Sequence, residues 1–131
     1  MSQEKVVRRL AQAFNQGDVD AIIAGLHPAV AWEEQPIPGV DSVYRGHEGV
    51  RRWAEAVFGP ELRSLQVDVE GFSEAGDAVI ASARLRGEGE SSGVAVQMYV
   101  HLVFTFREGQ VVRRQVFRSR EQALEAAGLP E

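Results

Sequence analysis

The chain has 131 residues, 44% of them hydrophobic and 25% charged, which is the composition of an ordinary globular protein. The net charge of -5, with no basic run to outweigh it, argues against nucleic-acid binding, and the absence of cysteine excludes disulfides and thiolate chemistry. No apolar run approaches the roughly 18 residues of a membrane span, and the charged first residues do not resemble a signal peptide. We therefore expect one cytoplasmic domain over residues 1–131, with no membrane contact.

Apolar residues recur at helical spacing in three stretches of the first half of the chain. The first stretch predicts a helix over residues 3–15. The second predicts a short helix that begins after the N-cap Asp18 and is ended by Pro28. The third predicts a helix over residues 50–58.

Alternation with a period of two predicts the strands. A short strand over residues 30–34 is followed by a Pro- and Gly-rich loop, residues 35–43, which we expect to lie over a cavity mouth. Further strands are predicted over residues 65–69 and 79–86, and a long hairpin over residues 93–118.

A terminal helix is predicted by the capping-box spacing from Ser119 to Gln122. The element order is then helix, helix, strand, helix, four strands and helix, which is typical of an α+β protein. We expect a cone-shaped roll: one curved, mixed or antiparallel sheet, three N-terminal helices on its concave face, and a short C-terminal helix. Such a cone has room for a small apolar molecule at its open end.

The hairpin is expected to turn at Glu108–Gly109, so that Arg107 faces Gln110 and opposed residues share a face of the sheet. The mixed face, which we assign to the cavity, carries Tyr99, His101, Val103, Thr105, Val112, Arg114, Val116 and Arg118. The apolar face carries Met98, Val100, Leu102, Phe104 and Phe106. Because this second face is too large to leave in water, it predicts a homodimer through the sheets unless the terminal helix covers it. A three-residue turn would recombine the two sets.

Four segments carry a family resemblance: LAQAFNQGDVDAI, VAWEEQPIPG, YRGHEGVRRW and HLVFTFREGQVVRRQVFRSREQALEAAGL. Over nearly the whole chain they resemble the SnoaL-like proteins of the nuclear transport factor 2-like superfamily. The resemblance implies a single SnoaL-like domain with the cone fold. The superfamily includes ketosteroid isomerases, polyketide cyclases, limonene-epoxide hydrolases, dehydratases and proteins without catalysis, so the activity must be argued from the site.

The resemblance also implies two catalytic positions. Counted without gaps from Gly17–Asp18, the general-base aspartate of ketosteroid isomerases falls on Glu34. Their buried acid, which donates a hydrogen bond to the enolate, falls on His101 when Gly109 is the anchor. A different anchor in the hairpin moves that position to Leu102, which has no polar group.

The residues themselves leave two interpretations open for each candidate. Glu34 is either a general base against an apolar wall formed by Trp32 and Trp53, or a solvent-facing carboxylate beside Glu33. His101 either lines the cavity and moves a proton near pH 7, or is a packed histidine or one that faces a dimer partner.

Two arginines on the expected cavity face, Arg114 and Arg118, are candidates for binding an anionic group such as a carboxylate. The alternatives are a solvated basic edge and an internal ion pair of Arg118 with Glu34. A lining for a flat, mainly apolar ligand is expected from Trp32, Tyr44, Trp53, Phe58, Tyr99, Val103 and Val116. The three histidines have no metal-ligand spacing, so we expect no metal site.

Three functions fit these patterns. The first is a cofactor-free isomerase, cyclase or dehydratase that acts on a mainly apolar carbonyl compound, with Glu34 as the base and His101 as the hydrogen-bond donor. The second is a ligand-binding module without turnover, and the third is a dimerisation module. The first two differ in whether Glu34 and His101 reach one cavity from opposite walls.

Overall fold

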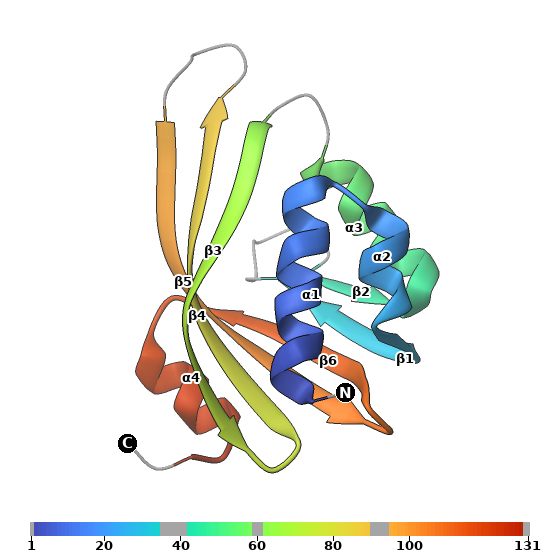
Figure 1. Ribbon diagram of the computed structural model, residues 1–131, viewed down its shortest axis with the longest axis vertical. Coiled ribbons are helices and arrows are strands. Elements are labelled where there is room, and N and C mark those ends of the chain that lie inside the picture. Colours follow the sequence, from blue (N-terminus) through green and yellow to red (C-terminus); the bar gives the residue numbers. More distant parts are fainter. Residues whose placement is uncertain (1, 35–41, 59–61, 90–94, 130–131) are drawn as a thin grey trace.

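The computed structural model describes residues 2–34, 42–58, 62–89 and 95–129 (Figure 1). The elements in chain order are α1 (Gln3–Gln16), α2 (Val19–Ala24), β1 (Leu26–Glu33), β2 (Val43–Arg45), α3 (Gly46–Val57), β3 (Leu62–Ala75), β4 (Ala78–Gly89), β5 (Ala95–Arg107), β6 (Gln110–Phe117) and α4 (Arg120–Ala126). None of the helices in the described part of the chain is long and apolar enough to span a membrane.

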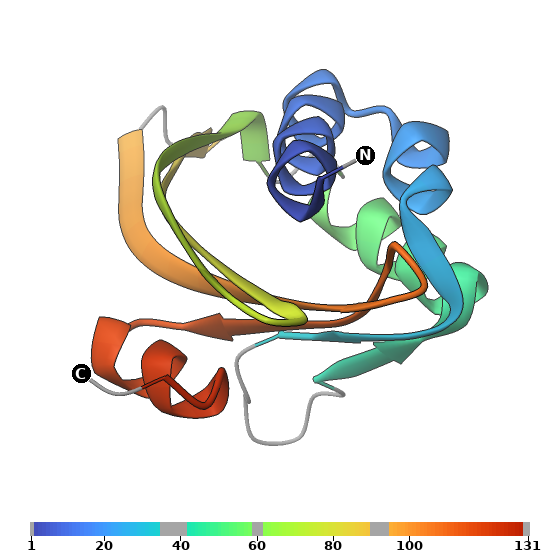
Figure 2. The same ribbon diagram turned by 60° about the horizontal axis from the view of Figure 1, so that its bottom comes forward.

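One six-stranded sheet of order β2-β1-β6-β5-β4-β3 holds the described strands together. Strands β1 and β6 are parallel and the other neighbours are antiparallel, so the sheet is mixed. Figure 2 shows the sheet curving around α1 to α3, while α4 lies on its outer side. The predicted α+β roll, with three N-terminal helices on the concave face and a short C-terminal helix, is confirmed.

The N-termini of three helices are capped by side chains that the sequence places there. Ser2, Asp18 and Ser119 accept hydrogen bonds from backbone N–H groups in the first turns of α1, α2 and α4. The capping interaction predicted for Ser119 is therefore present, with its Oγ accepting from Gln122 N at 3.4 Å.

The predicted end of the second helix is wrong. Helix α2 stops at Ala24, and the chain passes into β1 at Leu26, so Pro28 lies inside a strand rather than after a helix. Proline has no backbone N–H to donate to a neighbouring strand. Pro28 is tolerated because the hydrogen-bond ladder between β1 and β6 is irregular from Leu26 to Ala31. Most of the predicted loop lies outside the described residues, but its last residue, Val43, begins strand β2.

The hairpin turn is the one that the sequence predicts. Glu108 and Gly109 both have positive φ, 55° and 77°, as a two-residue turn between twisted strands requires, and Arg107 faces Gln110. The register then shifts by one residue: Phe106 faces Val111, but Thr105 faces Arg113. The shift is a β-bulge, which leaves one extra residue in β6 and turns the rest of that strand over.

The bulge recombines the predicted faces, and the cavity lies on the opposite side of β5 from the one predicted. Arg114 faces Phe104 and Val116 faces Leu102, so these residues share the concave face of the sheet. The outer face carries His101 opposite Phe117, and Val103 opposite Gln115. The assignment of Tyr99, His101 and Val103 to the cavity side is therefore wrong, whereas Arg114 and Val116 do lie on that side.

The apolar face of β5 is not an outer surface, because it lines the interior of the cone together with residues of α1. On the outer face, Val103 packs with Ile80 of β4 and Ala123 of α4. The apolar face of β5 therefore does not require a partner subunit to cover it, and the homodimer stays a prediction.

Lysine substitutions at neighbouring positions of β5 test these faces. Tyr99 is 53% exposed and Val100 only 5%, so we expect Tyr99→Lys to change the free energy of unfolding by no more than about 0.5 kcal/mol. Val100→Lys places an unpaired ammonium in the apolar interior and should cost roughly 3 kcal/mol or more. Urea unfolding measures both values, and the reverse ranking would contradict the observed faces.

Candidate functional site

An apolar cavity of about 530 Å³ lies between α1, α3 and the concave face of the sheet. Its walls are formed by Val7, Leu10, Ala11, Phe14, Trp32, Glu34, Tyr44, Trp53, Ala56, Val57, Leu65, Val67, Val69, Ala81, Leu85, Met98, Val100, Leu102, Phe104, Arg114 and Val116. Among these lining residues, Glu34 and Arg114 are the only charged ones. The cavity is therefore a mainly apolar space with one charged end.

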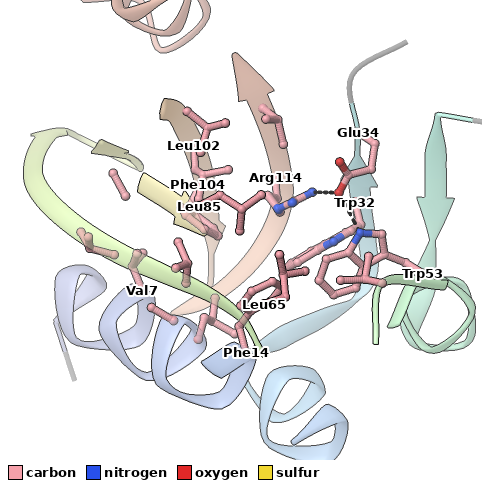
Figure 3. Close-up of a pocket in the computed structure, with 18 of the residues that line it drawn as sticks. Val7, Phe14, Trp32, Glu34, Trp53, Leu65, Leu85, Leu102, Phe104 and Arg114 are labelled. Atoms are coloured by element: carbon pink, nitrogen blue, oxygen red, sulfur yellow. Dashed lines mark hydrogen bonds and ion pairs between the residues drawn. The ribbon is translucent and has the colours of Figure 1, made fainter. Parts of the chain in front are cut away.

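The parallel pairing of β1 with β6 brings the two charged residues together. Trp32 faces Arg114 across this ladder, and Glu34 follows at the end of β1. The carboxylate Oε1 of Glu34 lies 2.9 Å from Nη1 of Arg114 and also accepts a hydrogen bond from the indole Nε1 of Trp53 at 2.7 Å (Figure 3). The same Arg114 Nη1 donates to the backbone carbonyl of Glu33 at 3.0 Å.

Two tryptophan rings enclose the guanidinium of Arg114. Its Cζ lies 4.4 Å from the ring centroid of Trp32 and 5.4 Å from that of Trp53, within the range of cation–π attraction. The residue is only 8% exposed, and this burial lowers the pKa of its guanidinium, with the carboxylate of Glu34 acting in the opposite direction. Because guanidinium groups stay protonated in proteins, we treat Arg114 as the cation of this pair.

Several polar atoms at this end have no hydrogen-bond partner among the described residues. Oε2 of Glu34 accepts no hydrogen bond there, and Nε and Nη2 of Arg114 donate none. The buried Nε1 of Trp32 has no partner either. A carboxylate oxygen and N–H donors on these two lining residues can hold a polar group or assist a proton transfer.

Six of the residues predicted for the site line this cavity: Trp32, Glu34, Tyr44, Trp53, Arg114 and Val116. Phe58 is not among the lining residues and packs against Phe14 and Trp53, with ring centroids 5.2 and 6.2 Å apart. Tyr99 and Val103 lie on the outer face, and Arg118 is exposed beyond the end of β6. The internal ion pair suggested for Arg118 and Glu34 is made by Arg114 instead.

His101 lies on the face of the sheet away from Glu34. Its Nδ1 is 2.9 Å from the hydroxyl of Ser82, the residue directly opposite on β4. Burial, and then the positive charge of Arg120, lower the pKa of His101 below its ordinary value of 6.5. The structure does not bring His101 and Glu34 together. The predicted pairing of Glu34 as the base with His101 as the donor is therefore wrong.

Two walls of the cavity were not predicted from the sequence. Helix α1 contributes Val7, Leu10, Ala11 and Phe14, whose spacing of three and four residues is the signal of a single helix face. Strand β5 contributes Met98, Val100, Leu102 and Phe104, the residues that had been assigned to a dimer interface. An apolar strand face has the same sequence pattern whether it lines a cavity or forms a subunit interface.

No group of three or more His, Cys, Asp or Glu side chains among the described residues is placed to hold a metal ion. The candidate site therefore consists of the apolar cavity and its Glu34–Arg114 end.

The pH dependence of stability tests the burial of His101. Its pKa is lowered in the folded state, so the unfolded chain binds a proton more readily and stability falls as the pH drops below about 6.5. We expect the free energy of unfolding of the wild type to decrease between pH 7.5 and 5.5 by more than that of His101→Gln. Urea titrations at each pH provide the comparison, and parallel curves for the two proteins would contradict it.

Comparisons with known proteins identify the family and the fold. The family model described as "SnoaL-like domain" matches residues 7–114. Among proteins with curated descriptions, none matches this sequence.

Several solved structures share the fold. An NTF2-like protein of unknown function from Burkholderia pseudomallei is 21% identical, with a TM-score of 0.80 over 95% of this chain and 97% of that chain. A hypothetical protein with a ketosteroid isomerase-like fold from Catenulispora acidiphila, in complex with trimethylamine, is 17% identical, with a TM-score of 0.78 over 98% and 96%. A putative SnoaL-like polyketide cyclase from Jannaschia is 21% identical, with a TM-score of 0.71 over 100% and 98%. At these identities the likeness shows the fold.

Proposed function

The chain belongs to the SnoaL-like domain family, as its four sequence segments predicted, and on that premise we propose that it binds a small, mainly apolar molecule inside the cone. The observation that carries the proposal is the cavity of about 530 Å³, where Glu34 and Arg114, the charged residues among the described ones that line it, meet at one end. A ligand would place its apolar body against α1 and β5 and its polar head at this end.

The size and lining of the cavity support this function. Its volume lies within the range of about 300–1,000 Å³ found for small-molecule sites. Two proteins of the same fold support small-molecule binding in general: one is in complex with trimethylamine, and another is described as a putative polyketide cyclase.

Filling the cavity tests the proposal. Val116 lines it, whereas the preceding residue, Gln115, lies on the other face of the same strand. We expect 2-acetylnaphthalene, a neutral aromatic ketone, to bind the wild type and Gln115→Trp with similar affinity, and to bind Val116→Trp at least tenfold more weakly, because the new indole occupies the space. Isothermal titration calorimetry gives the three dissociation constants. Equal binding by all three proteins would place the ligand elsewhere.

A second candidate function is proton transfer within the same cavity. It is favoured by Oε2 of Glu34, which accepts no hydrogen bond from the described residues, and by Nε and Nη2 of Arg114, which donate none to them. Glu34 would remove a proton next to a carbonyl group, and Arg114 rather than His101 would donate the hydrogen bond that stabilises the enolate. This role needs no cofactor.

Exchange of the methyl protons of 2-acetylnaphthalene in D₂O tests this chemistry. We expect the wild type to accelerate the exchange and Glu34→Gln to lose at least 100-fold of that acceleration, the lower end of the contribution of a general base. Glu33→Gln is the matched control, because Glu33 is the neighbouring carboxylate and pairs with Arg113 on the other side of the strand. NMR follows the methyl signal, and equal rates for wild type and Glu34→Gln would reject the base.

A further inference from the structure

The surroundings of the Arg114 guanidinium are those of a cation-binding site. Two tryptophan rings, Trp32 and Trp53, lie 5.1 Å apart with an angle of 62° between their planes, and both are within 5.4 Å of the guanidinium carbon. The carboxylate of Glu34 completes the set at 2.9 Å. Aromatic faces together with a carboxylate are the groups by which proteins recognise alkylammonium ions.

In this chain the cation that fills the site is part of the protein. We propose that Arg114 is the built-in occupant of a cage formed by Trp32, Trp53 and Glu34. Arg114 thereby sets the ligand class: the cavity binds apolar molecules that carry an oxygen acceptor and excludes alkylammonium ions. This inference rests on the proposed function, since it concerns the polar head of the ligand bound in that cavity.

The exclusion follows from space and from charge. The guanidinium occupies the position over the Trp32 ring that a trimethylammonium group would need. Among the lining residues one carboxylate, Glu34, is already paired with one cation, so a second cation would enter an apolar cavity with no counter-charge of its own. Repulsion between the two cations is stronger there than in water, because the cavity walls are poorly polarisable.

The preference for an oxygen acceptor follows from the free donors. Nη1 of Arg114 is used twice, by Glu34 and by the carbonyl of Glu33, while Nε and Nη2 donate to none of the described residues. A carbonyl, enolate or carboxylate oxygen at the charged end would satisfy these N–H groups. An alkylammonium head has no acceptor to offer them.

The β-bulge in β6 is what brings this arginine into the cage. With a regular ladder from the turn onward, Arg114 would face Val103 on the outer side of the sheet. One extra residue in β6 sends Arg114 inward opposite Phe104 and leaves Arg113 on the outer side, paired with Glu33. The ligand class is thus set by a one-residue shift in the hairpin.

Two isosteric probes test the exclusion of alkylammonium ions: benzyltrimethylammonium and its uncharged carbon analogue, neopentylbenzene. We expect the wild type to bind neopentylbenzene and to show at least tenfold weaker binding of the ammonium ion. Arg114→Ala empties the cage and leaves Glu34 uncompensated, so it should bind the ammonium ion at least tenfold more tightly than the wild type does. Chemical-shift changes of the tryptophan indole signals in NMR titrations report both ligands.

The controls separate space from charge. Arg114→Leu removes the positive charge but fills the space, and we expect it to gain no ammonium binding. Adding Glu34→Gln to Arg114→Ala should abolish the gain, because the carboxylate is lost. Wild-type protein that binds the ammonium ion as tightly as neopentylbenzene would overturn the inference, and so would a folded Arg114→Ala that binds neopentylbenzene and gains nothing.

The comparison of the two probes on the wild type decides the matter even where Arg114→Ala does not fold. Failure of the proposed function gives a different result from failure of this inference. If the proposed function is wrong, neither probe nor 2-acetylnaphthalene binds the wild-type protein, and this result overturns both the proposed function and the inference.

Discussion

A charged guanidinium inside an apolar cavity is the constraint around which this molecule is arranged. Taking such an ion out of water costs several kcal/mol, and the cost is offset only when a counter-ion and further hydrogen-bond partners are held in place. Arg114 has the carboxylate of Glu34, the backbone carbonyl of Glu33 and two tryptophan rings. Each comes from β1, from Glu34 directly after it, or from α3, so the charge links the sheet to the helix that closes one side of the cone.

The same interaction explains why the cavity has two chemically different ends. Trp53 reaches from α3 to Glu34 and fixes the carboxylate that holds Arg114, so these polar groups lie together (Figure 3). The rest of the lining from α1, β4 and β5 is apolar, and its contacts with a ligand do not fix the orientation of that ligand. Orientation, and any proton transfer, must then come from the Glu34–Arg114 end.

The sequence predicts the fold well because its local signals agree with one another. Helical spacing, capping residues and the Glu108–Gly109 turn each indicate their elements, and the family resemblance agrees with their order. The bulge has no such signal. It lies in the run Val111, Val112, Arg113, Arg114, where a shift by one residue replaces valine by valine and arginine by arginine. Alternation therefore could not decide which arginine points inward.

The site was predicted in part for the same reason. Trp32, Glu34 and Trp53 lie on elements whose faces are set by strong local patterns, and all three line the cavity. His101 was placed by counting from the hairpin turn, and its side of the sheet depends on the curvature and on α4, which covers neighbouring residues of that face. Long-range packing of this kind leaves no local trace in a sequence.

The coupling between Glu34 and Arg114 tests the central claim most directly. A double-mutant cycle with Glu34→Gln, Arg114→Met and the double variant, read out by urea unfolding at pH 7, isolates the interaction of the two side chains. Because the carboxylate and the buried guanidinium depend on each other, we predict a coupling energy of about 1–3 kcal/mol. Additive effects, with a coupling below about 0.5 kcal/mol, would contradict an ion pair held inside the cavity.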